Sequence, residues 1–181
     1  MHFTYSLNKA DILEHQLYIL SESKSFQKRR AKGRMFLLLI YMVSGVFIWQ
    51  RSGAITAAAF YVICFPFYFI YRKLEGNQYK KHISGFVDQQ YKDALDNEFH
   101  LEWDDKMLTS SAGDKSHQAT WMELESVVEL SSLFILNFRN SNALIIPKKD
   151  PVLQDVIRMD LKTKTEALGV PYEEKLNWKW N

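Results

Sequence analysis

The sequence contains a single cysteine, Cys64, among its 181 residues. One cysteine excludes an intramolecular disulfide and any zinc site built from several cysteine ligands. Because Cys64 lies inside an apolar run, we interpret its thiol as an inert group in a helix-packing or lipid-facing position. Glycine is also scarce, with seven residues, and no glycine-rich loop for a phosphate or a dinucleotide occurs. We therefore predict that the protein uses no cofactor.

Residue patterns that carry catalysis are absent as well. No serine lies in a nucleophile-elbow motif or in an S-x-x-K motif together with its partner residues. The acidic pairs at 104–105 and 173–174 are explained by a turn and by a solvated tail. The histidines are scattered, without metal-ligand spacing, and we expect each on the surface: they are His2, His15, His82, His100 and His117. The sequence therefore predicts that the protein is not an enzyme.

The overall charge is close to neutral, with 23 basic and 21 acidic residues. No basic face dominates the residues after position 71, so nucleic-acid binding is not expected. The basic residues gather instead on either side of a long apolar region. Those before it are Lys28, Arg29, Arg30, Lys32 and Arg34, and those after it are Arg72, Lys73, Lys80 and Lys81. We interpret these nine residues as setting membrane topology and attracting anionic lipid headgroups.

The apolar region, residues 35–71, carries one charge, Arg51. A helix that crosses a hydrocarbon core of about 30 Å needs roughly 20 residues. The second half of the region meets that length, and the first half is a few residues short. A single long span would bury Arg51 at a cost of several kcal/mol, whereas a turn places it in water. Neither half shows the polar stripe of a soluble core helix. We therefore predict a transmembrane hairpin with spans at 35–50 and 52–71.

The basic residues at both open ends of this hairpin predict its orientation. Loops rich in lysine and arginine stay in the cytoplasm, and the turn between the spans offers only Arg51. We therefore expect both termini and the soluble domain in the cytoplasm. Small residues on the two spans would allow close helix packing, either within the hairpin or between copies in a homo-oligomer: Ser44, Gly45, Ala54, Ala57 and Ala58.

The remaining residues predict a small sheet closed by a helix. In segment 1–34, residues 3–7 alternate as in a strand, and Asn8 is placed to cap a basic juxtamembrane helix. A helical connector is expected at 72–96. Short strand-like runs fill most of 97–169, with turns at 113–114 and 140–142. Asp150 and Gly169 are placed as the caps of a closing helix. The tail, 170–181, has no readable role. The fold class is therefore α+β, with an antiparallel sheet that curls on itself.

The order of these segments resembles the YcxB-like family of bacterial membrane proteins. The resemblance is carried by the segment that Trp121 begins, by Val127-Val128-Glu129, and by the Ile-Ile-Pro-Lys stretch before the last helix. It implies a soluble domain similar to a pleckstrin-homology fold, with the N-terminal strand joining the sheet and the two spans inserted after it. It also implies a bacterial inner-membrane location. It transfers no catalytic residue.

Two functions fit this sequence. The first is a membrane-anchored interaction module whose cytoplasmic domain binds a protein segment or a lipid headgroup. The second is an accessory subunit of a membrane enzyme or of a transport assembly. The candidate surface residues are Trp121, Lys148 and Lys149. We interpret Trp121 chiefly as a core anchor and the two lysines chiefly as a solvated loop, although both lysines are also candidates for meeting a phosphate.

Overall fold

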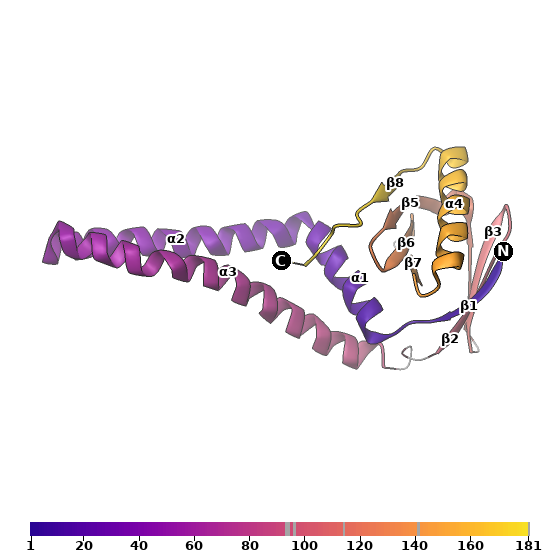
Figure 1. Ribbon diagram of the computed structural model, residues 1–181, viewed down its shortest axis with the longest axis horizontal. Helices are drawn as coiled ribbons and strands as arrows, with labels where there is room; N and C mark the ends of the chain where they lie inside the picture. Colours follow the sequence, from indigo (N-terminus) through magenta and orange to yellow (C-terminus); the bar gives the residue numbers. More distant parts are fainter. Residues whose placement is uncertain (93–94, 96, 114, 141, 181) are drawn as a thin grey trace. The chain divides into compact units, whose positions relative to one another are not determined.

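The computed structural model describes residues 1–92, 95, 97–113, 115–140 and 142–180, and the chain is of the α+β class, as predicted. It divides into two compact units. The sheet unit comprises Met1–His15 and Gly85–Lys179, and the hairpin unit comprises Gln16–Ser84 and Trp180–Asn181. Figure 1 labels most of the elements of both units.

Two long helices form most of the hairpin unit. They are α2, Lys24–Ser52, and α3, Ala54–Gln90, joined at Gly53, whose φ of 84° favours glycine. The preceding helix α1, Lys9–Glu22, does not run on through the basic stretch, contrary to the expected continuous helix. Ser23 interrupts it, because its side chain accepts a hydrogen bond from the backbone N–H of Phe26 and so caps α2.

The two long helices contact each other through small residues and tyrosines. Tyr41 donates a hydrogen bond to the carbonyl of Tyr61 at 2.6 Å, and Tyr61 donates one to the carbonyl of Met42 at 3.1 Å. Gly45 and Ala57 are buried in this contact region. Of the small residues that the sequence singled out, these two are the closely packed ones, since Ala54 and Ala58 are exposed.

Replacing Gly45 with alanine is expected to loosen this hairpin. A Cβ at that position would lie 2.0 Å from the ζ-carbon of the Tyr61 ring, so the ring has to leave its place. Overpacking of this kind costs about 1–3 kcal/mol. The matched control is Gly33→Ala in the same helix, where nothing lies within 4 Å. Thermal denaturation in detergent, followed by circular dichroism, should show a lower midpoint for G45A alone. Equal midpoints for the two variants would contradict the packing described.

The strands of the sheet unit form two sheets. The first has the order β1-β2-β3-β4 and the second β7-β6-β5-β8, with every pairing antiparallel except that of β8 with β5. The strands are β1 His2–Ser6, β2 Glu98–Trp103, β3 Met107–Ala112, β4 Lys115–Thr120, β5 Leu124–Glu129, β6 Leu133–Phe138, β7 Ala143–Pro147 and β8 Tyr172–Glu174.

The single curling sheet that the sequence predicted is thus divided in two, for a local reason. A short 3₁₀ turn, Trp121–Glu123, separates β4 from β5. The backbone N–H of Thr120 donates to the carboxylate of Glu123 at 3.0 Å, which fixes this corner. Because the chain changes direction there, β5 pairs with β6 and β8 instead of with β4.

The N-terminal strand joins the first sheet, as the resemblance implied. Phe3 lies opposite Leu101 in the antiparallel pairing of β1 with β2. The expected cap of the next helix is also present: the backbone N–H of Asn8 donates to the carboxylate of Asp11 at 3.0 Å, and the backbone N–H of Asp11 donates to the Asn8 side chain at 2.9 Å. The strands β1 and β2 are therefore neighbours although residues 7–97 separate them in sequence.

One hydrophobic core lies among the two sheets and the helix α4, Pro151–Leu168. Asp150 caps the start of α4 through the backbone N–H groups of its first turn, and Gly169, with a φ of 65°, ends it, so both predicted caps are confirmed. The apolar face of α4 contributes Ile157 and Leu161 to the core. The strands contribute Phe3, Leu101, Trp103, Leu108, Leu124, Val127, Phe134, Leu136, Phe138 and Ile146.

Parts of the predicted connector and turns lie outside the described residues: positions 93, 94, 96, 114 and 141. Helix α3 covers the connector as far as Gln90. The tail also contains an element that the sequence did not predict, because β8 pairs in parallel with β5, with Val127 opposite Tyr172.

Candidate functional site

A groove of about 1050 Å³ opens in the sheet unit beside strand β4. Residues of both sheets line it, from β4 on one side and from β7 and the β6–β7 connection on the other. Its apolar lining consists of Phe99, Leu108, Ala112, Ala119, Phe138, Ala143 and Leu144. Its polar lining includes Ser110, Lys115, Ser116, His117, Gln118, Asn140 and Asn142. A cavity that combines apolar side chains with a few polar groups is typical of a binding site, and here Lys115 is the one charged residue in the described lining.

Strand β4 forms one margin of this groove, and its edge is open. In the strand order of the described residues β4 pairs with β3 alone, and Lys115–Gln118 are exposed. Across the groove, the His117 ring and the Asn142 amide approach to 3.2 Å. An edge strand presents unpaired backbone N–H and C=O groups that can accept a further strand. Sequence reasoning predicted the strand but not the groove, because the groove depends on how two sheets meet.

Of the three predicted surface residues, Trp121 is part of the core. Its side chain is 3 % exposed, and its ring meets that of Trp103 edge to face at 5.9 Å. Its indole N–H donates to the carbonyl of Asp104 at 2.8 Å. Lys149 is about half exposed, and its ammonium group donates to the carbonyl of Ser6 at 2.7 Å.

The third residue, Lys148, is enclosed in a cluster of charged groups around Glu129. Its ammonium group lies 2.6 Å from Oε1 of Glu129, and the two side chains are 3 % and 1 % exposed. Arg158 of α4 donates to the same oxygen at 2.8 Å, and the hydroxyl of Tyr172 in β8 donates to the other oxygen at 2.5 Å. The cluster therefore links β5, β8, α4 and the end of β7. The interpretation of Lys148 as part of a solvated loop is wrong, because its ammonium group is buried against Glu129 and cannot meet a ligand.

The electrostatics of this cluster favour the charged form of the acid. Burial by itself would raise the pKa of Glu129, but the hydrogen bonds from Lys148, Tyr172 and Arg158 outweigh that effect, so its pKa lies below the ordinary value. Burial and the hydrogen bond to Glu129 both raise the pKa of Tyr172, which stays a donor. The one sign of this cluster in the sequence was an acid, Glu129, between the apolar residues Val128 and Leu130.

His15 is another titratable group whose burial the sequence did not predict. It is 6 % exposed, so the expectation of a surface residue is wrong for it, while His2, His82, His100 and His117 are exposed. Burial lowers the pKa of His15 to about 4, and its ring nitrogens have no hydrogen-bond partner among the described residues. Its spacing from buried Ile12 and Tyr18, three residues either way, could have revealed the burial. Within the same residues, no cluster of His, Cys, Asp or Glu side chains could hold a metal ion.

The nine basic residues of the predicted belt all lie in the hairpin unit. Arg30 and Arg34 are partly buried and both contact Oε2 of Glu75, at 3.4 Å and 3.0 Å. The other seven are exposed: Lys28, Arg29, Lys32, Arg72, Lys73, Lys80 and Lys81. In this belt, two arginines share an ion pair with Glu75, and the other seven cations face solvent.

Arg34 and Arg72 lie at matching positions on α2 and α3. Each is 19 residues from Gly53, where the two helices meet. At 1.5 Å per residue, the 18 residues between either arginine and Gly53 span about 27 Å. Both helices are long and apolar enough to cross a membrane, and 6 % of each apolar window is buried. A soluble core helix would be mostly covered.

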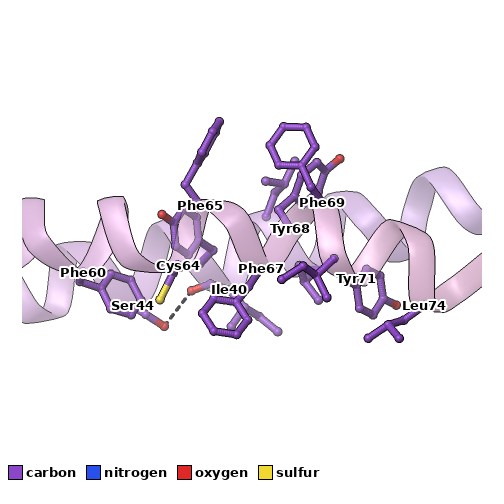
Figure 2. Close-up of a pocket in the computed structure, with 14 residues that line it drawn as sticks. Ile40, Ser44, Phe60, Cys64, Phe65, Phe67, Tyr68, Phe69, Tyr71 and Leu74 are labelled. Carbon is purple, nitrogen blue, oxygen red and sulfur yellow. Dashed lines mark hydrogen bonds between the residues drawn. The ribbon is translucent and has the colours of Figure 1, made fainter.

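An apolar groove of about 590 Å³ runs along these two helices, and Figure 2 shows the aromatic side chains that line it. Cys64 and Ser44 are among the lining residues, and the Ser44 hydroxyl donates to the carbonyl of Ile40 in its own helix at 2.8 Å. The groove therefore presents mainly carbon atoms, the kind of surface that acyl chains or another apolar helix covers.

Comparisons of the chain with family models, with curated proteins and with solved structures found no match. The resemblance to the YcxB-like family stays a prediction, and the functional assignment depends on the geometry of the two units.

Proposed function

We propose that this chain is an integral membrane protein of the bacterial inner membrane, anchored by α2 and α3 as a transmembrane hairpin. The exposed apolar surface of both helices and the matching positions of Arg34 and Arg72 support this anchoring. The pairing of β1 with β2 supports it further. Two strands of one sheet lie on one side of a bilayer, so the chain between them crosses an even number of times.

The orientation that follows places both termini and the sheet unit in the cytoplasm. The open ends of the hairpin carry nine basic residues against Arg51 at the turn. The resemblance implied a closing helix, an N-terminal strand in the sheet and a hairpin inserted after that strand, and these three features support keeping it. The YcxB-like family and a domain similar to a pleckstrin-homology fold are therefore part of the proposal.

We propose further that the sheet unit is a non-enzymatic interaction module whose groove receives an extended protein segment. The groove beside the open edge of β4 carries this proposal. A segment that pairs with β4 would satisfy the backbone groups of that edge and place alternate side chains in the groove. A protein segment fits better than a lipid headgroup here, because Lys115 is the one charged residue in the described lining.

Photocrosslinking in native membranes tests this function. A photoreactive residue at Gln118, which lines the groove, should capture a recurrent protein segment, whereas one at Met122, which is 80 % exposed outside the groove, should not. The captured segment, added as a peptide to the full-length protein, should slow amide hydrogen exchange in β4. Lipid adducts alone at position 118, or equal capture at both positions, would contradict the proposal.

The second function, an accessory subunit of a membrane enzyme or transport assembly, is favoured by the apolar groove of the hairpin (Figure 2). It predicts that a photoreactive residue at Phe65 captures a helix of another membrane protein. Capture of a second copy at that position would instead show a homo-oligomer, and capture of lipid alone would show that acyl chains cover the groove.

A further inference from the structure

A pocket of about 440 Å³ lies at the basic end of the hairpin unit. Its lining is Phe69, Arg72, Lys73, Gly76, Asn77 and Trp180. Five of these six residues follow the spacing i, i+3, i+4, i+7, i+8 along α3, which places them on one face of that helix. Along this face, an aromatic ring is followed by two cations and then by a glycine and an amide.

The sixth residue, Trp180, comes from the C-terminal segment and closes the pocket. Its indole N–H donates to the carbonyl of Gly76 at 2.9 Å. Its ring lies 6.1 Å from that of Phe26, and the guanidinium of Arg30 lies 5.5 Å from its centroid. These contacts with both helices hold the indole in place, and they give a position to a tail whose role the sequence did not predict.

The two cations of the pocket are available to a ligand. Arg72 and Lys73 are exposed, and across the described residues neither makes an ion pair or a hydrogen bond with a side chain. The neighbouring Arg34 is different, because Glu75 compensates its charge at 3.0 Å. The pocket therefore combines two uncompensated positive charges with the amide of Asn77, a set of donors that suits a phosphate group.

The level of the pocket on α3 identifies the source of that phosphate. Arg72 is the first charged residue after the 18 apolar residues of α3, and Phe69 lies about 4.5 Å nearer the turn, at 1.5 Å per residue. In the proposed hairpin, this is where the hydrocarbon core gives way to lipid headgroups. Indole rings also prefer this level of a bilayer.

We propose that this pocket binds the phosphodiester of an anionic phospholipid, with Arg72 and Lys73 as the cationic contacts and Trp180 as the closing wall. The lipid's acyl chains would follow the apolar face past Phe69. An anionic headgroup is favoured over a zwitterionic one because the latter brings a positive charge towards two cations. The inference rests on the proposed membrane anchoring, and it makes the C-terminal segment part of a lipid site.

Native mass spectrometry of the delipidated full-length protein, titrated with phosphatidylglycerol or phosphatidylcholine, tests the site. The double variant R72Q/K73Q should lose affinity for phosphatidylglycerol on the order of thirty-fold, since each cation near the surface contributes about 1 kcal/mol. The control K80Q/K81Q removes the same charge from the same helix, two turns further from the apolar part, and should retain most of the affinity. W180A should weaken binding, and W178A, which lies outside the pocket, should not.

Each contrary result has a defined meaning. Equal losses in R72Q/K73Q and K80Q/K81Q would show a diffuse attraction to the belt and would overturn the site. Equal affinity for the two lipids would overturn the choice of an anionic headgroup, and displacement by inorganic phosphate would overturn the lipid as its source. Extraction of native membranes with alkaline carbonate distinguishes a failure of the membrane anchoring from a failure of the lipid site. Release of the protein would contradict the anchoring itself, whereas retention with equal losses would contradict this site alone.

Discussion

Replacing Glu129 with alanine should lower the free energy of unfolding of the sheet unit by about 3–5 kcal/mol. The substitution leaves Lys148, whose side chain is 3 % exposed, without its carboxylate, and it removes the acceptor of the Arg158 Nε–H and of the Tyr172 hydroxyl. An unpaired buried cation costs far more than the loss of an ion pair in water. Urea denaturation of the full-length protein in mild detergent, followed by tryptophan emission, measures the effect.

The control for Glu129→Ala is Glu174→Gln, which breaks the pair of Lys162 and Glu174. Both of those side chains are more than 40 % exposed, so the expected loss is about 0–1 kcal/mol. Because the pKa of Glu129 is lowered in the folded protein, its contribution is present above the pKa of an unfolded glutamate, about 4.3, and disappears as the pH falls through the folded pKa. A loss below 1 kcal/mol for E129A at neutral pH would contradict a structural role for this cluster.

Acidification from pH 6.5 to pH 4 should weaken the sheet unit by about 3 kcal/mol through His15 alone. Burial lowers the pKa of His15 to about 4, so the folded protein keeps the ring neutral while the unfolded chain binds a proton near pH 6.5. The contribution of neutral His15 to stability is therefore fully present above pH 6.5 and declines towards pH 4. This pH range lies mostly above the range in which Glu129 titrates.

The pH dependence of the variant His15→Leu tests this assignment. Leucine cannot take up a proton, so the slope of unfolding free energy against pH between 6.5 and 4 should become shallower by the amount that His15 contributes. His2→Gln, which changes an exposed histidine of the same unit, should keep the wild-type slope. An unchanged slope in H15L would show that another group causes any acid sensitivity.

Sequence patterns predicted the parts of the fold that are decided locally. The helix α4 was predicted with both ends because Asp150, Pro151 and Gly169 act on neighbouring backbone groups. The strands were predicted because alternation records which face of a strand is buried. Strand β8 was missed since three residues carry no periodicity, and it exists only through its pairing with β5.

The candidate sites were harder to predict because they depend on residues far apart in the sequence. Lys148 was recognised as a cation, but its partner Glu129 lies 19 residues earlier, and nothing local connects them. Trp180 and Gly76 are separated by 104 residues. The basic belt was predicted as a set, whereas the distinction between paired Arg34 and free Arg72 required the position of Glu75.

The pairing of β1 with β2 has a consequence for biosynthesis. Strand β1 leaves the ribosome before β2, and 91 residues, 7–97, are made between the two strands. At about 5–20 residues per second, β1 waits roughly 5–20 s, during which the two apolar helices are synthesised. The edge of β1 that pairs with β2 stays unpaired until then. In the proposed membrane protein, insertion of the hairpin therefore begins before β1 and β2 can pair.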